Sequence, residues 1–276
     1  RTLNATEINR YPGGNRDVSK VIQSLPGVAA TVSFRNDIII RGGAPSENKF
    51  HLDGIEVPNI NHFATQGSSG GPVGLLNVNL IREVDFYSAA FPANRANGLS
   101  SVIAFQQKEG NSDRFATTFT VGSSDFGLTF DGPLGDKANF IFSARTSYLQ
   151  LLFKLLELPF LPTYNDAQFK INYKIDQKNE ITFIGLGALD LFKLNKSVND
   201  DVEDSLTYER NNYILGYLPT QNQWNYTIGT KYTHYFENSY LNIVLSRNYL
   251  NNTARKYRNN DDSDAANKLL QYESAE

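Results

Sequence analysis

The pattern of apolar and polar positions divides the chain into two parts. In residues 1–110, short apolar runs alternate with glycine and proline. In residues 111–276, long segments alternate between apolar and polar positions, as where Phe169 and Ile171 flank Lys170. A period of two is the pattern of β-strands that have one apolar face. We therefore expect two domains with this boundary.

The first domain carries the signals of a small α+β fold. Apolar residues at helical spacing, ended by Pro26 and Gly27, predict a short helix over residues 15–25. Asp53 and Gly54 lie between two apolar arms, which is the signature of a tight hairpin. Apolar and β-branched runs predict further elements, which are strands over residues 37–41, 81–87 and 102–105 and a short helix over residues 75–80.

The second domain contains about seven alternating segments, and their alternation fits two architectures. One is a soluble β-sandwich with one face in its core, and the other is a transmembrane β-barrel with its apolar face in lipid. Several segments have about ten residues or more, which is enough to cross a bilayer at a tilt. Aromatic residues near segment ends, among them Phe140, Trp224 and Tyr249, are typical of the interfacial girdles of barrels.

Two stretches interrupt the alternation. Residues 147–158 have the composition of a helix that is too short to span a membrane, with Ser147 as a candidate N-cap. Residues 195–212 are polar and are expected to form a long connection between strands.

Composition excludes several classes of function. The 26 Lys+Arg and 29 Asp+Glu give a formal charge of −3, which offers no basic surface for nucleic acid. The chain has no cysteine, so disulfides, thiolate metal sites and cysteine nucleophiles are excluded. It also has no methionine, so its first residue is not a natural start, and we expect a piece of a longer protein.

No residue pattern points to an enzyme. Residues 67–72 resemble the surroundings of a serine-protease nucleophile but lack a histidine base in the right order, so we interpret them as a Gly/Ser loop. His51, His62 and His234 lack metal-ligand spacing. The acidic stretches at 200–204 and 259–264 lack the spacing of an EF-hand. The sequence therefore predicts no catalysis, no cofactor and no metal.

Several motifs of the first domain occur together in one known family. LPGV at residues 25–28, IRGG at 40–43 and LDG at 52–54 are followed by an alternating strand at 80–87. In this order they resemble the plug of TonB-dependent outer-membrane receptors. Residues 88–95 depart from the Gly-Pro-containing turn that is usual in that family, which suggests a divergent subfamily with an unknown substrate.

The resemblance implies an α+β plug domain, residues 1–110, followed by antiparallel strands of a transmembrane β-barrel, residues 111–276. Barrels of this family have typically 22 strands. Residues 111–276 suffice for roughly seven or eight strands of about ten residues each, so the barrel would be incomplete in this chain.

The implied function is ligand-gated active uptake of a nutrient through the outer membrane of a Gram-negative bacterium. The implied partners are outer-membrane lipid, a nutrient ligand and the TonB energy-coupling complex. In this family TonB grips a segment upstream of the plug, which is not present here. Whether a surface lipoprotein lids the vestibule stays open.

The resemblance also places the segment after the hairpin, residues 58–72, at the apex of the plug. There it would face the extracellular vestibule where ligand docks. Amides, an imidazole and a stacking ring suit polar, sugar-like or peptide ligands. The expected ligand contacts are Asn59, Asn61, His62, Phe63 and Gln66. Residues 34–36 would form a second apical loop, with Arg35 as its candidate contact.

A second hypothesis comes from a different class of protein. The chain would then be a secreted β-sandwich that serves as a carbohydrate-binding or adhesion module and binds through exposed aromatic side chains. Further alternating strands in the gene beyond Glu276 would favour the receptor, and a stop codon there would favour the module.

Overall fold

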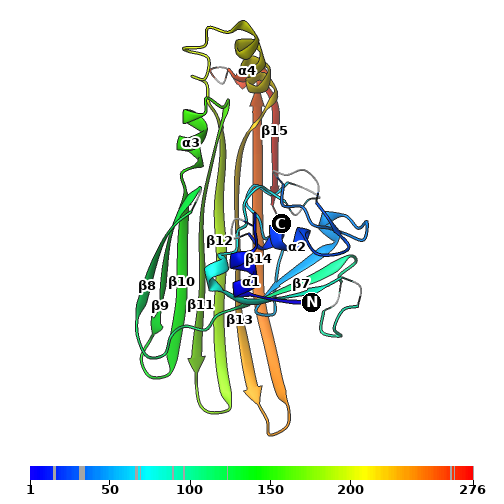
Figure 1. Ribbon diagram of the computed structural model, residues 1–276, viewed down its shortest axis with the longest axis vertical. Helices are drawn as coiled ribbons and strands as arrows, with labels where there is room; N and C mark the ends of the chain where they lie inside the picture. Colours follow the sequence, from blue (N-terminus) through cyan, green and yellow to red (C-terminus); the bar gives the residue numbers. More distant parts are fainter. Residues whose placement is uncertain are drawn as a thin grey trace.

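The computed structural model describes residues 1–14, 17–30, 35–65, 68, 70–88, 90–95, 97–122, 124–261, 263 and 265–275. An N-terminal unit, residues 1–107, lies against one face of a tall sheet that begins at residue 116 (Figure 1). Within these described ranges, no helix is long and apolar enough to cross a membrane.

The N-terminal unit is built on a five-stranded sheet with the strand order β1-β6-β7-β4-β5. Its strands are β1 (Thr2–Asn4), β4 (Asn48–Leu52), β5 (Ile55–Val57), β6 (Ile81–Tyr87) and β7 (Ser101–Gln107). β4 and β7 are parallel, and the other neighbours are antiparallel. The smaller elements are β2 (Val28–Ala29), β3 (Ile39–Ile40), α1 (Ala5–Arg10), α2 (Val18–Gln23), η1 (Pro45–Glu47) and η2 (Val78–Leu80).

Local chemistry sets the bounds of these elements. α2 is shorter than the helix predicted over residues 15–25, because Asp17 caps it by accepting a hydrogen bond from the Ser19 amide. Residues 15 and 16 lie outside the described residues. β3 is shorter than the strand predicted over residues 37–41, since Arg41 has a φ of 51° and turns the chain. The strands predicted over 81–87 and 102–105 are confirmed, and the helix predicted over 75–80 is the single turn η2.

The predicted hairpin at Asp53-Gly54 is confirmed. Both residues have positive φ angles, 49° and 93°, as a type I′ turn requires. The Asp53 carboxylate accepts hydrogen bonds from the backbone amide and the side chain of Gln107. It also lies 3.2 Å from the Lys170 ammonium of the tall sheet, so the tip of the hairpin is fixed to that sheet.

The apolar core continues from the N-terminal unit into the tall sheet. Ile22, Phe50 and Phe105 pack between the helices and the five-stranded sheet, each almost completely buried. Ile184 and Leu186 of the tall sheet join the same cluster. The two units therefore share one core, and the N-terminal unit has a fixed position against the tall sheet.

The tall sheet has eight strands, one more than the predicted seven, in sequential antiparallel order. They are β8 (Ala116–Val121), β9 (Asp125–Pro133), β10 (Ala138–Ser147), β11 (Phe160–Lys174), β12 (Asn179–Leu194), β13 (Thr220–Tyr235), β14 (Tyr240–Tyr257) and β15 (Lys268–Ala275). Over the described part of the chain, β8 and β15 are the edges of this sheet, which is not closed.

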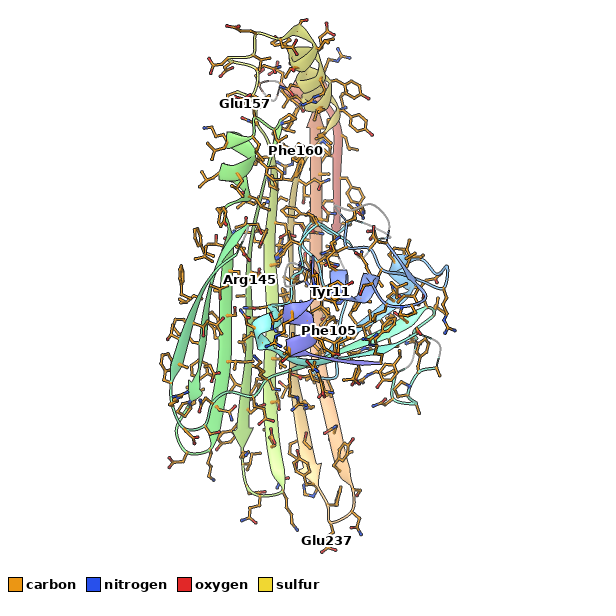
Figure 2. All side chains as sticks on the ribbon, viewed as in Figure 1. Tyr11, Phe105, Arg145, Glu157, Phe160 and Glu237 are labelled. Atoms are coloured by element: carbon orange, nitrogen blue, oxygen red, sulfur yellow. The ribbon has the colours of Figure 1, made fainter. Side chains whose placement is uncertain are left out.

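The connections differ between the two ends of the tall sheet. Short turns join the strands at the lower end, where Glu237 lies (Figure 2). The upper end carries the longer connections, which contain α3 (Leu149–Leu155), α4 (Ser205–Tyr217), η3 (Arg258–Asn260) and η4 (Ala265–Asn267) (Figure 1). Short turns at one end and long loops at the other are typical of outer-membrane barrels, whose long loops are extracellular.

Two expectations about these connections need correction. α3 is shorter than the predicted 147–158, and Tyr148, not Ser147, stands at its N-cap. The Ser147 hydroxyl instead accepts a hydrogen bond from the Tyr164 amide. The stretch 195–212 is not only a polar connection, because α4 begins within it. Asp204 caps α4 by accepting from the Thr207 amide, a cap signal that the polar composition concealed.

The predicted alternation of the strands is confirmed, and it decides between the two architectures. On β11 the even-numbered side chains from Tyr164 to Asn172 are buried and face the N-terminal unit, while Phe169 and Ile171 face away. The buried face of β11 is thus mainly polar. The outer face of the tall sheet carries aromatic pairs, such as Phe130 of β9 with Phe142 of β10. A sandwich buries its apolar face, whereas a barrel turns that face to lipid. The sandwich interpretation is therefore wrong.

We predict that Ile171→Arg strongly reduces the yield of folded full-length protein in outer membranes. A lipid-facing arginine costs up to about 2–4 kcal/mol, depending on its depth in the bilayer. The measurement is the amount of heat-modifiable, folded protein in isolated outer membranes.

The matched control is Thr118→Arg. Thr118 is exposed and pairs with Thr129, which faces the N-terminal unit, so both belong to the inner face of the sheet. Asn172 is less suitable, because it is buried and bonds Asn139 and Thr182. Equal yields of the two arginine variants would contradict a lipid-facing position for Ile171.

Candidate functional site

A buried histidine joins the N-terminal unit to the tall sheet. His62 Nδ1 lies 2.6 Å from Asp190 Oδ1 on β12, and His62 Nε2 lies 3.0 Å from Asp166 Oδ2 on β11. The three side chains are at most 1% exposed. Both ring nitrogens therefore face carboxylates without intervening solvent.

Arg145 of β10 completes this group of charges. Its Nε donates to Asp166 at 3.0 Å, and its Nη2 donates to the carbonyl oxygens of Gly74 and Leu75 at 2.9 and 2.7 Å. Two carboxylates thus face one guanidinium and one imidazole. Buried charges are tolerated when they are paired and hydrogen-bonded. We call His62, Arg145, Asp166 and Asp190 the charge cluster.

The two carboxylates of the cluster favour the protonated form of His62. Burial alone would lower the pKa of the imidazole, but Asp190 and Asp166 outweigh burial and raise the pKa of His62 above its ordinary 6.5. A protonated imidazole has two N–H donors and can donate to both carboxylates at once. Two positive and two negative charges then balance within the cluster.

The turn that carries His62 is held from several sides. The Asn59 side chain accepts from the Asn61 amide at 3.1 Å, and the Asn61 side chain accepts from Ser19 and Asn36 at 3.2 and 3.1 Å. Phe63, at a φ of 53°, donates its amide to Asp190 at 2.7 Å. These contacts aim the imidazole at the tall sheet. We call residues 59–63 the apical turn.

A glycine is essential behind the apical turn. A Cβ atom on Gly71 would lie 1.4 Å from the His62 carbonyl oxygen. Any other residue at position 71 would therefore displace either its own backbone or that of His62. The His62 amide donates to Val73 at 2.8 Å in the same region. Gly71 thus serves close packing.

The structure brings most of the predicted ligand residues together, but with different exposures. Asn59 and Phe63 are partly exposed, whereas Asn61 and His62 are fully buried. Direct ligand contact by Asn61 or His62 is therefore not possible in this conformation. Gln66 lies outside the described residues.

Arg35 belongs to the same region. Its side chain is 28% exposed and donates to Asp37 at 2.6 Å, to Ser68, and to Thr65 at 3.3 Å. Residues 34–36 and the segment 58–72 therefore meet, as expected of two apical loops, although Phe34 lies outside the described residues. These bonds, led by the one from Arg35, outweigh the burial of Asp37 and lower the pKa of its carboxyl.

The sequence analysis did not identify Asp166 and Asp190, the two carboxylates that the tall sheet contributes to the charge cluster. Asp166 and Asp190 stand at inward positions of alternating strands, where a carboxylate has no lipid to avoid, so nothing in the pattern marks them. The only signal in the sequence is that a charged residue recurs among the inward-facing positions of these two strands. Their partner His62 is more than a hundred residues distant, and only the fold joins them.

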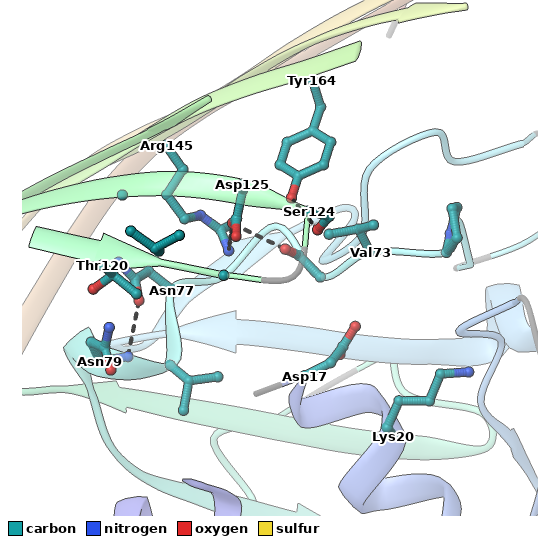
Figure 3. A pocket seen from close by; sticks show the side chains of 16 residues that line it. Asp17, Lys20, Val73, Asn77, Asn79, Thr120, Ser124, Asp125, Arg145 and Tyr164 are labelled. Carbon is teal, nitrogen blue, oxygen red and sulfur yellow. Dashed lines mark hydrogen bonds and ion pairs between the residues drawn. The ribbon is translucent and has the colours of Figure 1, made fainter. Parts of the chain in front are cut away.

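A cavity of about 430 Å³ lies beside the charge cluster, between the N-terminal unit and the tall sheet (Figure 3). Asp17 and Lys20 line it from one side and Asp125, Arg145 and Tyr164 from the other. Burial raises the pKa of Asp17 although Ser19 and Asn36 donate hydrogen bonds to it. Polar groups therefore line this cavity on both sides.

A second set of bonds fixes the junction below the cluster. The Asn77 amide donates to Gln168 at 3.1 Å, and the Asn77 side chain donates to Ser143 at 2.6 Å. Gln168 in turn donates to Gln107 at 2.7 Å. Together with the Lys170–Asp53 ion pair, these bonds make β11 the main anchoring strand of the tall sheet.

Comparison with known proteins assigns both units. The family model of the TonB-dependent receptor plug domain matches residues 1–116. The N-terminal unit is a TonB-dependent receptor plug domain. The tall sheet lies against one face of this unit, and its fold matches part of the barrel of such receptors. Proteins of this family are transporters, not enzymes, and reside in the Gram-negative outer membrane.

Solved structures have the same arrangement of plug and wall. The ferric enterobactin receptor PfeA of Pseudomonas aeruginosa superimposes with a TM-score of 0.66 at 13% identity, covering 100% of this chain and 44% of the receptor. The outer-membrane transporter YddB of Escherichia coli gives 0.62 at 14% identity, covering 92% and 39%. The copper transporter OprC gives 0.64 at 11%, covering 100% and 41%.

These similarities concern the fold. The chain spans less than half the length of each of these receptors. No curated protein matches the chain.

We predict that the plug loosens from the wall at alkaline pH in a way that depends on His62. The pKa of His62 is raised in the folded state, so its stabilising contribution is fully present below 6.5 and is lost as pH rises through the raised value. The measurement is the maleimide labelling rate of a cysteine at buried Ala64 in full-length receptor, divided by that of a cysteine at exposed Leu134.

The control is the same pair of cysteines in His62→Gln. Glutamine can still form hydrogen bonds but does not titrate. The pH dependence of the ratio of labelling rates should therefore largely disappear. An equally steep pH dependence in wild type and His62→Gln would contradict the assignment to His62.

Proposed function

We propose that the chain is the plug and the first barrel strands, residues 1–110 and 111–276, of a receptor that takes up a nutrient. Ligand binding at the extracellular apex of the plug would be coupled to release of the plug from the wall. Energy for the movement would come from TonB. The observation that carries this proposal is the charge cluster, which lies directly under the apical turn.

The position of Phe63 supports coupling between ligand and cluster. Its side chain is partly exposed, and its backbone amide donates to Asp190, a member of the cluster. A ligand that moves the Phe63 ring would strain this bond at a site shielded from water, where hydrogen bonds to a charged group are worth about 1.5–3 kcal/mol.

The exposures divide the predicted ligand residues into two groups. We propose Asn59, Phe63 and Arg35 as ligand contacts, because each has exposed side-chain atoms at the apex. Asn61 and His62 hold the apical turn and the wall, and they would respond to ligand without contacting it. Gln66 stays a proposed contact on the sequence alone.

The proposed energy coupling follows from the family. The sequence begins at β1, which pairs with β6 at the edge of the plug sheet. A TonB-gripped segment upstream of β1 would therefore pull on an edge strand of the same sheet that carries the hairpin. A surface lipoprotein over the vestibule stays a proposal that rests on the resemblance alone.

The proposal is tested with a reversible crosslink between plug and wall. Gln223 on β13 donates to the Ala64 carbonyl at 3.1 Å, so cysteines at these two positions lie close together, and the chain has no other cysteine. A short thiol-cleavable crosslinker should abolish uptake of a radiolabelled nutrient that supports receptor-dependent growth, and a reductant should restore it.

Single-cysteine variants treated with the same crosslinker are the controls and should transport normally. Unchanged uptake with the crosslink complete by mass spectrometry would show that the plug does not leave the wall at this point.

A further inference from the structure

A column of aromatic rings rises along the inner wall above the charge cluster. Phe160 of β11 and Phe192 of β12 have ring centroids 5.5 Å apart and nearly parallel planes, at 19°. Phe153 of α3 meets Phe160 edge-on at 5.5 Å. All three side chains are partly exposed. We call Phe63, Phe153, Phe160, Tyr164 and Phe192 the aromatic column.

Strand alternation places these rings inside the barrel. Phe160 is four residues from Tyr164 on β11, and Phe192 is two residues from Asp190 on β12, so each pair shares a face. Tyr164 and Asp190 both contact His62 of the plug. Phe160 and Phe192 therefore face the lumen, and Figure 2 shows Phe160 toward the upper end of the sheet.

The lower end of the column reaches the plug. The Tyr164 ring lies 4.2 Å from the His62 ring and 6.4 Å from the Phe63 ring, with Phe63 edge-on at 83°. The four residues from Phe160 to Tyr164 cover about 13 Å at the rise of a β-strand. Rings thus follow one another from the loop end of the wall to the apical turn.

The column differs from the inner face below it, which carries polar side chains and the buried Ile184, Leu186 and Ala188 of the shared core. Below it, β11 and β12 present Gln168, Lys170, Asn172 and Thr182 to the interior. Phe160 and Phe192 are not members of the apolar core that plug and wall share. Partly exposed rings on a polar, concave surface are a common feature of ligand sites, where they provide flat apolar contacts.

The groups around the column indicate a neutral ligand. Phe192 pairs with Gln221 of β13. Asn59 is a partly exposed residue of the apical turn below, and its side-chain amide bonds the Asn61 backbone.

The cations at the foot of the column, His62 and Arg145, are bonded to carboxylates. Lys193, next to Phe192, stands at an outward position of β12, and Lys154, next to Phe153, is exposed on α3. On the strands, the inward neighbour of Phe192 is the uncharged Gln221, so a ligand that stacks on rings and exchanges hydrogen bonds with amides fits this face.

We propose that the aromatic column is a binding subsite for the pyranose rings of a neutral oligosaccharide. The apolar C–H faces of the sugar would stack on Phe160 and Phe192, and its hydroxyl groups would bond Gln221 and the apical turn. The inference rests on the proposed uptake function and names its substrate class. Phe63 at the foot of the column would connect an occupied subsite to Asp190 of the charge cluster.

The test is calorimetric titration of purified full-length receptor with four probes: maltohexaose, cellohexaose, chitohexaose and the catechol 2,3-dihydroxybenzoate. We expect at least one hexaose to bind and the catechol not to bind. In Phe160→Ala/Phe192→Ala the affinity for that hexaose should fall about 10- to 100-fold, since two stacking contacts are lost.

The matched control is Phe142→Ala, which removes a ring from the lipid-facing side of β10 and should leave affinity within about twofold. Heat-modifiable migration establishes that all variants are folded. Binding of no hexaose, binding of the catechol alone, or wild-type affinity in the double variant would overturn the inference.

These outcomes are separable from those of the crosslinking test. If the crosslink blocks uptake but no hexaose binds, only the substrate class is wrong. If a hexaose binds through the column but the crosslink leaves uptake unchanged, the subsite stands and the gating proposal fails.

Discussion

The structure depends on one constraint: a barrel that turns its apolar face to lipid must hold its plug with polar groups. The inward positions of β11 from Tyr164 to Asn172 are mainly polar and are buried where the plug covers them, while Ile184 and Leu186 of β12 join the shared apolar core. Each charge there needs a partner of opposite sign. His62 meets this need for two carboxylates at once, and Arg145 neutralises the remainder.

In the proposed mechanism, this arrangement suits a domain that is held firmly and is still released. Removing one partner of a buried ion pair costs about 3–5 kcal/mol, because a charge is left in a site without water. The charge cluster therefore favours two states, closed with all partners paired or open with all partners hydrated. A cavity of about 430 Å³, lined by residues that include Asp17, Asp125 and Tyr164, lies beside it.

The sequence predicted what depends on local pattern. The hairpin at Asp53-Gly54, the faces of Phe169, Ile171 and Asn172 and the plug-then-strands order all follow from spacing and motif. It predicted that the segment with His62 mattered but treated His62 as a ligand contact, because exposure is a property of the assembled fold. Asp166 and Asp190 could not be found, since a carboxylate facing the lumen is ordinary until a distant histidine lies between two of them.

The most direct measurement is a double-mutant cycle between His62→Gln and Asp190→Asn in full-length receptor. Its readout is the free energy of opening, obtained from hydrogen exchange of the Leu75 amide, which donates to Ile60 at 2.7 Å within the plug. A charge-paired junction predicts a coupling energy of at least about 1.5 kcal/mol. Effects that add to within about 0.5 kcal/mol would show that His62 and Asp190 do not act as a pair.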